Sequence, residues 1–562
     1  MQENHGGVLG IDASTQSMSA ILMDSASGEI LWDRSLVYRD DPRLLGLGFE
    51  HESMIIPPRE RGEAEQPPRL FIVAFDALFS DLRAAGIDLS SIVAINTSGQ
   101  QHGHVYLNGK AKDAFSSLQE PASGEYDLLS ALADCFAYGG APIWKTANTA
   151  TEAAHIRAEV GGSANMIRLT GSDIPLRFSA NIHRRLARRY PEAYGATRHI
   201  LQISSLIPAI LAGDCTIPID FGNACGTGLM NSKARNWDDA VMQAVAGDLP
   251  GGSAVLAEKL SPINHPLSVC GTIAMYFQVK YGLSADCKII VGSGDNPQSK
   301  VLAGGSLLRL GSSFVYMISS PNGEVDTAGV ANAMYDGLGR AFNIWCRTNG
   351  ALSWDRLRTW HSLGVRDYAT CESALVDTLP GSLIRFWHPD AESFPAVSAC
   401  SQPVRLDNSP ITFANDYSAV VDSSLGLIYC YGQKITGEST RLDQEPLIVC
   451  GGPTISLGVM RRIAAIWNRP AMQAGQAGAA LGAAVAAAVA LVSETERDDL
   501  AEKLRRAIFI GKNIIKPDPD MVYAYHAPKG YLEQLECAFE KMRRGSPTIP
   551  DRHQCLRLRR NG

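Results

Sequence analysis

Two stretches of this chain share one alternation of apolar and small polar residues. Each has an apolar run, a loop of small polar residues, a second apolar run and a turn that contains Asn-Gly or Ser-Gly. The first copy covers residues 8–29 and the second covers residues 308–324. Apolar runs separated by short polar loops predict β-hairpins. The pattern therefore predicts two related hairpins, about three hundred residues apart.

The bends of these two hairpins carry candidate chemistry. The first bend contains Asp12 and the run Ser14-Thr15-Gln16, and the second contains Gly311-Ser312-Ser313. Small residues in a tight bend can direct backbone N–H groups and hydroxyls at phosphate oxygens. Two such bends in one chain indicate two related lobes that hold one polyphosphate. We therefore expect a nucleoside triphosphate as a ligand.

The other periodic segments indicate an α/β architecture. Apolar residues recur at helical spacing from 71 to 82, and an alanine-rich run over 477–492 predicts a tightly packed core helix. Three further apolar runs predict buried strands, each followed by a polar or glycine-rich loop. These runs cover residues 89–95, 288–291 and 447–450. Polar loops at the carboxyl ends of strands in an α/β sheet are well placed to face a ligand.

Length and composition predict a two-domain soluble protein. The 562 residues exceed what one hydrophobic core usually supports. We expect lobes at 1–303 and 304–543, followed by a basic, flexible tail at 544–562. A net charge of −7 argues against nucleic acid as the main partner, and no apolar run is long enough to span a membrane. The twelve scattered cysteines lack a C-x-x-C pair, which favours reduced thiols and a cytoplasmic location.

Seven short motifs, in order and in register, make the chain resemble the FGGY family of carbohydrate kinases, closest to its eukaryotic-type xylulokinase branch. The motifs are Asp12-Ala-Ser-Thr-Gln, Ser98-Gly-Gln-Gln-His-Gly, Arg177-Phe178, Ile219-Asp220, Gly294-Asp295-Asn296-Pro297, Leu310-Gly311-Ser312-Ser313 and Gly451-Gly452. The resemblance implies two ribonuclease-H-like lobes of the actin and hexokinase superfamily with a central cleft. It also implies sugar binding by the first lobe, ATP binding by the second, and a homodimer as a common assembly.

The same resemblance implies roles for individual residues. Asp295, a carboxylate in a glycine-flanked loop, would be the base that accepts the proton of the sugar hydroxyl. Its alternative interpretation is an Asx-turn cap after a strand. Asp12 becomes the water-mediated Mg²⁺ contact, because Mg²⁺ keeps several waters and uses one or two carboxylates. The remaining roles are sugar contacts for Gln101, His102, Arg177 and Asn296, phosphate contacts for Ser14, Thr15, Gln16, Gly311, Ser312 and Ser313, and adenosine contacts for Gly451, Gly452 and Ser456.

One departure from the family pattern leaves the identity of the sugar substrate undecided. Two residues after Trp144 the family usually carries an aspartate, and this chain has Lys145-Thr146 instead. The leading interpretation is an ATP- and Mg²⁺-dependent kinase for a primary hydroxyl of a small ketose, most simply D-xylulose. The alternatives are a kinase for another ketose or a polyol, such as ribulose, erythrulose or a ribitol-like compound, and a catalytically silent sugar- or nucleotide-binding regulator. An actin-like assembly protein fits less well, because the sugar-side residues are present.

Overall fold

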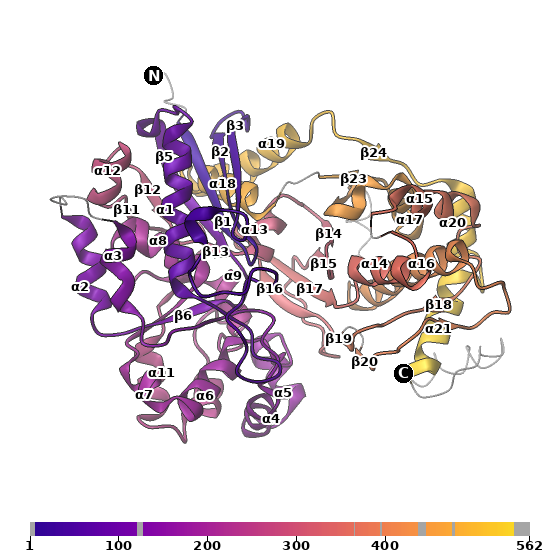
Figure 1. The fold of residues 1–562 in the computed structure, drawn as a ribbon, viewed down its shortest axis with the longest axis horizontal. Coiled ribbons are helices and arrows are strands. Elements are labelled where there is room, and N and C mark those ends of the chain that lie inside the picture. Colours follow the sequence, from indigo (N-terminus) through magenta and orange to yellow (C-terminus); the bar gives the residue numbers. More distant parts are fainter. Residues whose placement is uncertain are drawn as a thin grey trace. The chain divides into compact units, whose positions relative to one another are not determined.

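The computed structural model describes residues 6–120, 127–364, 366–393, 396–436, 445–474 and 478–543. The chain divides into two compact units that interleave along the sequence (Figure 1). Unit 1 comprises Met1–Ala303, Ser320–Asn343 and Ala477–Ile510, and unit 2 comprises Gly304–Ser319, Ile344–Gln476 and the chain from Gly511 onward. This division differs from two contiguous lobes, because two later segments pack into unit 1. The predicted tail at 544–562 lies outside the described residues.

Unit 1 is built on a mixed β-sheet. Its strands run in the order β3-β2-β1-β5-β12, and β11 lies beyond β12. The β1–β2 and β2–β3 pairs are antiparallel, whereas β1–β5 and β5–β12 are parallel. The bounds are β1 Gly7–Ala13, β2 Ser17–Asp24, β3 Ile30–Val37, β5 Ile92–Gly99, β11 Val269–Thr272 and β12 Lys288–Ile290. The predicted first hairpin is therefore confirmed.

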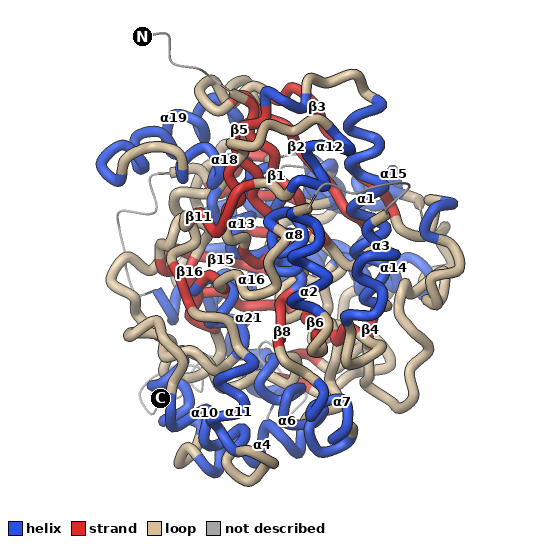
Figure 2. Tube along the Cα trace, turned by 90° about the vertical axis from the view of Figure 1, so that its left-hand side faces the viewer, coloured by secondary structure: helices blue, strands red, loops and turns tan. Residues whose placement is uncertain are grey.

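Both faces of this sheet are covered by helices. Leu9 and Ile11 belong to one core with α1 (Pro68–Ala84) and α8 (Ile203–Ala212). Val8 and Ala94 belong to a second core with the buried alanine-rich helix α18 (Ala479–Ala490). Figure 2 shows α18 and α8 beside the strands of this sheet. The sequence correctly predicted α1 and α18 as helices, and tertiary packing brings α18 back to the first strand.

Gly10 explains why α18 can lie so close to β1. A Cβ atom at this position would lie 1.9 Å from the Ala480 carbonyl oxygen and 2.5 Å from the Ala484 backbone nitrogen. Distances this short would force the helix away from the strand. Glycine on the strand and alanine on the helix therefore permit direct backbone packing under the loop that follows β1.

Unit 2 repeats the strand order of unit 1. Its strands follow the order β17-β15-β14-β22-β23-β24, with β14–β15 antiparallel and β14–β22–β23 parallel. The bounds are β14 Ser306–Leu310, β15 Phe314–Ser319, β17 Ala341–Arg347, β22 Leu447–Cys450, β23 Ala471–Gln473 and β24 Ile514–Ile515. The second predicted hairpin and the strand at 447–450 are thus confirmed. The shared order confirms that the chain contains two related α/β halves.

A second helical core in unit 1 carries part of the candidate site. It packs α4 (Ala150–Glu159), α6 (Ser179–Arg189) and α10 (Asp239–Ala246) around the antiparallel strands β6 (His104–Leu107) and β8 (His199–Gln202). No helix of the described residues is long and apolar enough to cross a membrane.

Two details differ from expectation. The strand predicted at 89–95 begins at Ile92 and continues to Gly99, because Leu89–Ser91 form a 3₁₀ turn that Asp88 caps. The polar residues predicted to follow this strand thus form its carboxyl end. Ten of the described cysteines form no disulfide, but Cys537 is disulfide-bonded, so the expectation of reduced thiols fails there.

Candidate functional site

The first bend is organised around the carboxylate of Asp12. Asp12 is 9% exposed and accepts hydrogen bonds from Ser14 Oγ at 2.6 Å and from Ser98 Oγ at 2.7 Å. Ser98 comes from the neighbouring strand β5, which pairs with β1 in parallel. One hydroxyl therefore contacts each carboxylate oxygen and fixes its orientation at the carboxyl end of the sheet. Among the described residues, no group of three His, Cys, Asp or Glu side chains is placed to hold a metal.

Thr15 is held by side chains from three distant segments. Its hydroxyl donates to Gln100 Oε1 at 3.0 Å and accepts from Trp144 Nε1 at 2.9 Å, and Gln66 Nε2 donates to its carbonyl. Gln16, the next residue, has an exposed side chain and accepts a backbone hydrogen bond from Tyr38. This bend is therefore rigidly supported, while Gln16 points to solvent.

Asp295 begins helix α13 (Asp295–Val301), directly after the short strand β13 (Ser293–Gly294). Its Oδ1 accepts hydrogen bonds from the backbone N–H groups of Gln101, at 3.1 Å, and Asn296, at 2.9 Å. A Cβ atom on Gly294 would lie 1.7 Å from Gln101 Oε1, so glycine here lets the Gln101 side chain lie against this loop. The backbone thus holds a half-buried carboxylate beside the loop that follows β5.

His102 adopts a left-handed backbone, with φ of 69°, and is 6% exposed. Its Nδ1 lies 2.7 Å from the Gly226 carbonyl oxygen, so Nδ1 carries the proton and Nε2 is an acceptor. Arg177 Nε lies 3.4 Å from that Nε2, and Phe178 stacks on the ring. Burial, assisted by the Arg177 guanidinium, lowers the pKa of His102 to about 3, so the ring is neutral at physiological pH.

Asp220, a motif residue to which the sequence assigned no role, connects the Asp295 loop to the short helix α9 (Phe221–Ala224). Its Oδ2 accepts from Ser293 Oγ at 2.7 Å and its Oδ1 accepts from the Asn223 backbone N–H at 3.0 Å. Asn223 Oδ1 in turn accepts from Gln101 Nε2 at 3.2 Å. Asp220 thus supports the Asp295 loop in two ways: it binds Ser293 directly, and it binds Asn223, which holds the Gln101 side chain. Only the short motif around Ile219-Asp220 signalled this network in the sequence.

The Asp220 carboxyl predicts a pH dependence of stability. Burial raises the pKa of Asp220 to about 7, whereas an unfolded aspartate titrates near about 3.9. Between these values the folded protein binds more protons than the unfolded chain, so the free energy of unfolding falls as pH rises from about 4 to about 7. Asp220→Asn, which has no carboxyl proton to lose, should therefore gain thermal stability relative to the wild type across this window. Melting curves at several pH values test this, and a constant difference between the two proteins would contradict it.

The unit 2 bend contains Gly311, Ser312 and Ser313. The Gly311 N–H donates to the Ser313 carbonyl, and the Gly311 carbonyl accepts from the Ala351 N–H, both at 3.0 Å. Gly350 packs against this bend, since a Cβ there would lie 2.7 Å from the Ser312 carbonyl oxygen. The bend is thus fixed by its own backbone and by the start of helix α14 (Ala351–Trp360).

The Gly451-Gly452 turn follows strand β22. Gly451 has φ of 107°, and a Cβ atom there would lie 2.0 Å from the Leu310 carbonyl oxygen, so only glycine fits. Gly452 has no neighbouring atom within 4 Å of its Cβ position, so its exposed side leaves room for a ligand. Ser456 caps helix α17 (Leu457–Ile466) by accepting from the Val459 N–H, and its hydroxyl donates to Glu372 Oε2 at 2.5 Å.

Lys145 and Thr146, which depart from the family pattern, lie in different environments. Thr146 is 4% exposed and its hydroxyl donates to the Ala64 carbonyl oxygen at 2.9 Å, so this side chain has a structural contact. Lys145 is exposed, and its ammonium lies 5.5 Å from the ring centroid of Trp144, which itself donates to Thr15. The lysine, not the threonine, therefore lies toward the first bend.

This arrangement changes the expected effect of restoring an aspartate. In Thr146→Asp, a buried carboxylate would face the Ala64 carbonyl oxygen without a donor, which should lower the free energy of unfolding by about 1–3 kcal/mol. Thr146→Val removes only the hydrogen bond and should cost less, while Lys145→Met at the exposed neighbour should change stability little. Denaturant titrations of the three variants measure the order. Equal stability of Thr146→Asp and wild type would show that the carboxylate finds another partner.

Within unit 1, the structure therefore gathers the predicted residues Asp12, Ser14, Thr15, Gln101, His102, Arg177, Asp295 and Asn296 around the carboxyl ends of β1, β5 and β13. They are supported by five residues with no role predicted from the sequence: Gln66, Ser98, Gln100, Trp144 and Asn223. The predicted residues of unit 2 lie in the bend at 311–313 and the turn at 451–456.

Comparisons with known proteins concern the sequence and the fold of the chain. Residues 139–301 match the N-terminal domain of the FGGY family of carbohydrate kinases. A protein named probable D-xylulose kinase A from Aspergillus flavus is 30% identical over 356 residues, covering 62% of this chain and 60% of that protein. The xylulose kinase of Mus musculus is 31% identical over 291 residues, 52% of this chain and 50% of the relative. The chain thus matches between half and three fifths of these relatives' length.

A solved structure extends the comparison of the fold to almost the whole chain. The ligand-bound xylulose kinase from Lactobacillus acidophilus has a TM-score of 0.76 at 18% identity, covering 96% of this chain and 98% of that one. At this identity the likeness concerns the fold, which is the two-lobe α/β fold expected from the sequence. Residues 139–301 thus match the N-terminal domain of the FGGY family of carbohydrate kinases, part of the chain is similar to named xylulose kinases, and the chain shares their fold.

Proposed function

We propose that the protein is an ATP-dependent sugar kinase that phosphorylates a primary hydroxyl of a small ketose, with D-xylulose converted to D-xylulose 5-phosphate as the leading reaction. The family and the names of the relatives support this proposal. The single observation that carries it is the position of Asp295. This carboxylate is held by the backbone N–H groups of Asn296 and of Gln101, the residue before the neutral His102 that Arg177 contacts.

Asp295 has the properties that a catalytic base needs here. Its Oδ1 is occupied by the N–H groups of Gln101 and Asn296, which fixes the orientation of the carboxylate. Phosphoryl transfer demands little covalent chemistry from the protein, so positioning the acceptor hydroxyl and accepting its proton are the main tasks. A half-buried carboxylate held by the backbone can perform both.

The neighbouring residues suit a polyhydroxylated substrate. The buried oxygen Gln101 Oε1 accepts no hydrogen bond within the described residues and lies against the Cβ position of Gly294, so it can accept one from a sugar hydroxyl. His102 Nε2 is an acceptor and Arg177 supplies donors beside it. Asn296 adds an amide next to the base. We assign these four residues to the sugar.

The first bend suits Mg²⁺ bound with ATP. Mg²⁺ prefers hard oxygen ligands, keeps several waters and needs only one or two carboxylates, which the Asp12 carboxylate with its two serine hydroxyls can provide. The metal would neutralise charge on the transferred phosphoryl group. We assign Ser14, Thr15 and Gln16 to phosphate oxygens. In unit 2 we likewise assign Gly311, Ser312 and Ser313 to phosphate, and Gly451, Gly452 and Ser456 to adenosine.

The direct test measures ADP release with Mg-ATP against a panel of ketoses and polyols, including D-xylulose, D-ribulose, L-erythrulose and ribitol. ADP release that requires both a sugar and Asp295 supports the kinase, and the ranking of sugars identifies the substrate. A protein that binds ATP but turns over none of the panel would favour the silent regulator. Preference for a sugar other than D-xylulose would favour the second candidate function, for which the exposed Lys145 beside Trp144 is the specific observation. A homodimer, a cytoplasmic location and the absence of nucleic acid remain predictions.

A further inference from the structure

A cavity in unit 1 lies apart from all the residues assigned above. Its volume is about 550 Å³, and it lies between the loop after β6, helix α7 (Pro191–Ala196), the start of β8 and helix α11 (Gly252–Lys259). His104 pairs with Gln202 at one end of the β6–β8 pair, whereas Leu107 pairs with His199 at the cavity end. His102 of the candidate sugar site comes just before strand β6, and the cavity begins just after it. The length of β6, about 10 Å, therefore separates the two sites.

The cavity gathers positive charge. Lys112, Arg198 and Lys259 line it, against a single carboxylate from Glu258, which leaves a net charge of +2. None of these four side chains forms an ion pair among the described residues. Within the described part of the chain, the Arg198 guanidinium donates to the backbone carbonyl oxygens of Gly195 and Thr197. Cations that line one cavity without an ion pair favour an anionic ligand.

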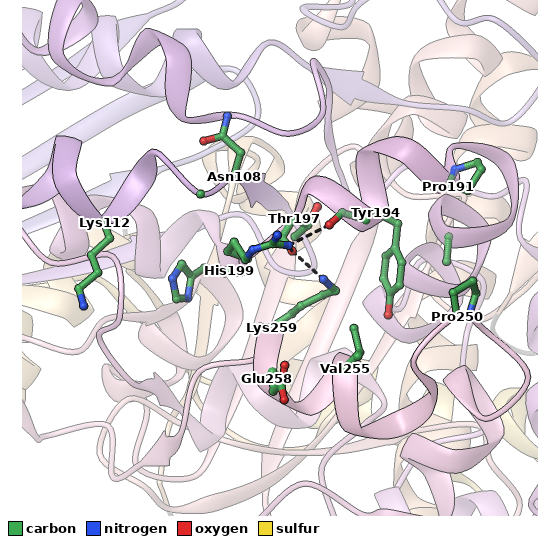
Figure 3. Close-up of a pocket in the computed structure, with 14 residues that line it drawn as sticks. Asn108, Lys112, Pro191, Tyr194, Thr197, His199, Pro250, Val255, Glu258 and Lys259 are labelled. Atoms are coloured by element: carbon green, nitrogen blue, oxygen red, sulfur yellow. Dashed lines mark hydrogen bonds between the residues drawn. The ribbon is translucent and has the colours of Figure 1, made fainter.

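Lys259 is the unusual member of this group. It is only 5% exposed, and its ammonium donates to the Thr197 carbonyl oxygen at 2.6 Å while it lies 5.0 Å from the ring centroid of Tyr194. Figure 3 shows Lys259 reaching toward Thr197, with Tyr194 beside it. Burial lowers the pKa of Lys259, and the Arg198 guanidinium adds to that effect. An ammonium has three donors, so an anion in the cavity could use the remaining two.

We propose that this cavity binds a small organic phosphate monoester. A phosphate monoester is close to a dianion at neutral pH and so matches the net charge of +2, whereas a monocarboxylate would neutralise half of it. The volume exceeds the size of a phosphate ion and leaves room for an organic group. Tyr194 and Val255 supply an apolar wall for that group. The proposal does not depend on the kinase assignment.

Binding is tested by titration calorimetry at low ionic strength with D-ribose 5-phosphate, AMP, inorganic phosphate and uncharged D-ribose. We expect saturable binding of at least one phosphate ester, weaker binding of inorganic phosphate, and none of D-ribose. Lys259→Met should weaken the ester at least tenfold. Because Lys259 also contacts the Thr197 carbonyl, Arg198→Gln at an exposed position serves as a second variant and should do the same.

Two controls separate this cavity from the candidate sugar site. Lys110→Gln changes an exposed lysine paired with Asp134 outside the cavity and should bind like the wild type. Arg177→Gln alters the candidate sugar site and should also leave ester binding unchanged. Absence of saturable binding to any phosphate compound would overturn the proposal. Ester binding that survives in both Lys259→Met and Arg198→Gln would overturn it as well, and so would ester binding that is lost in Arg177→Gln. Equal affinity for inorganic phosphate and for the esters would show that the cavity does not bind the organic group.

Discussion

Asp295→Asn is expected to lower the turnover of sugar phosphorylation by about 10²–10⁴-fold, the range typical for loss of a general base. The substitution keeps an oxygen that can accept from the backbone N–H groups of Gln101 and Asn296, so the loop should retain its shape. What it removes is the charge and the basicity. Steady-state assays give kcat, and a binding titration should show nearly unchanged affinity for Mg-ATP.

The matched control is Asp286→Asn, an exposed aspartate in the loop before β12 on the same unit. This variant should retain wild-type turnover. If turnover stays within tenfold of the wild type in both Asp295→Asn and Asp286→Asn, Asp295 only orders the backbone of Gln101 and Asn296 and is not the base.

Asp12→Asn is expected to lower kcat/KM for Mg-ATP by at least about 10²-fold. A metal ion stabilises transition-state charge by several kcal/mol, and each 1.36 kcal/mol corresponds to about a tenfold change in rate. Asparagine nearly matches the shape of aspartate, and the hydroxyls of Ser14 and Ser98 can rotate to suit its amide, so the loss should reflect the missing charge. Rates measured over a Mg²⁺ titration should show a higher Mg²⁺ requirement.

Asp33→Asn provides the comparison for this prediction, because Asp33 is exposed on strand β3 of the same sheet. Its Mg²⁺ dependence should equal that of the wild type. An unchanged Mg²⁺ requirement in Asp12→Asn would show that Asp12 shapes the bend through its two serines without contributing to the metal.

Much of the fold follows from local patterns in the sequence. The hairpins β1–β2 and β14–β15 were predictable, because apolar runs joined by small polar loops are short-range signals. Helix α1 was predictable for the same reason, since its apolar residues recur on one face. The boundary of β5 was not, because Asp88 caps a 3₁₀ turn in residues that look like the start of a strand.

The candidate site was predictable in its members but not in its contacts. Short motifs with distinctive composition pointed to Asp12, His102 and Asp295, and the structure adds what holds them. The hydrogen bond between Asp220 and Ser293 joins residues 73 positions apart, and the Gly226 carbonyl that sets the tautomer of His102 lies 124 positions from it. No local pattern specifies such pairs.

The sequence by itself determined two related α/β halves, because strand periodicity and glycine-rich bends are properties of neighbouring residues. The residues proposed to carry the chemistry were predicted from the motifs that the chain shares with a known family. The tertiary structure alone decided which segments form each unit. The alanine-rich sequence of α18 predicted close packing. Only the folded chain shows that its partner is Gly10, some four hundred and seventy residues earlier in the sequence. Contacts at that range depend on the shapes of whole surfaces, which no single segment of sequence encodes.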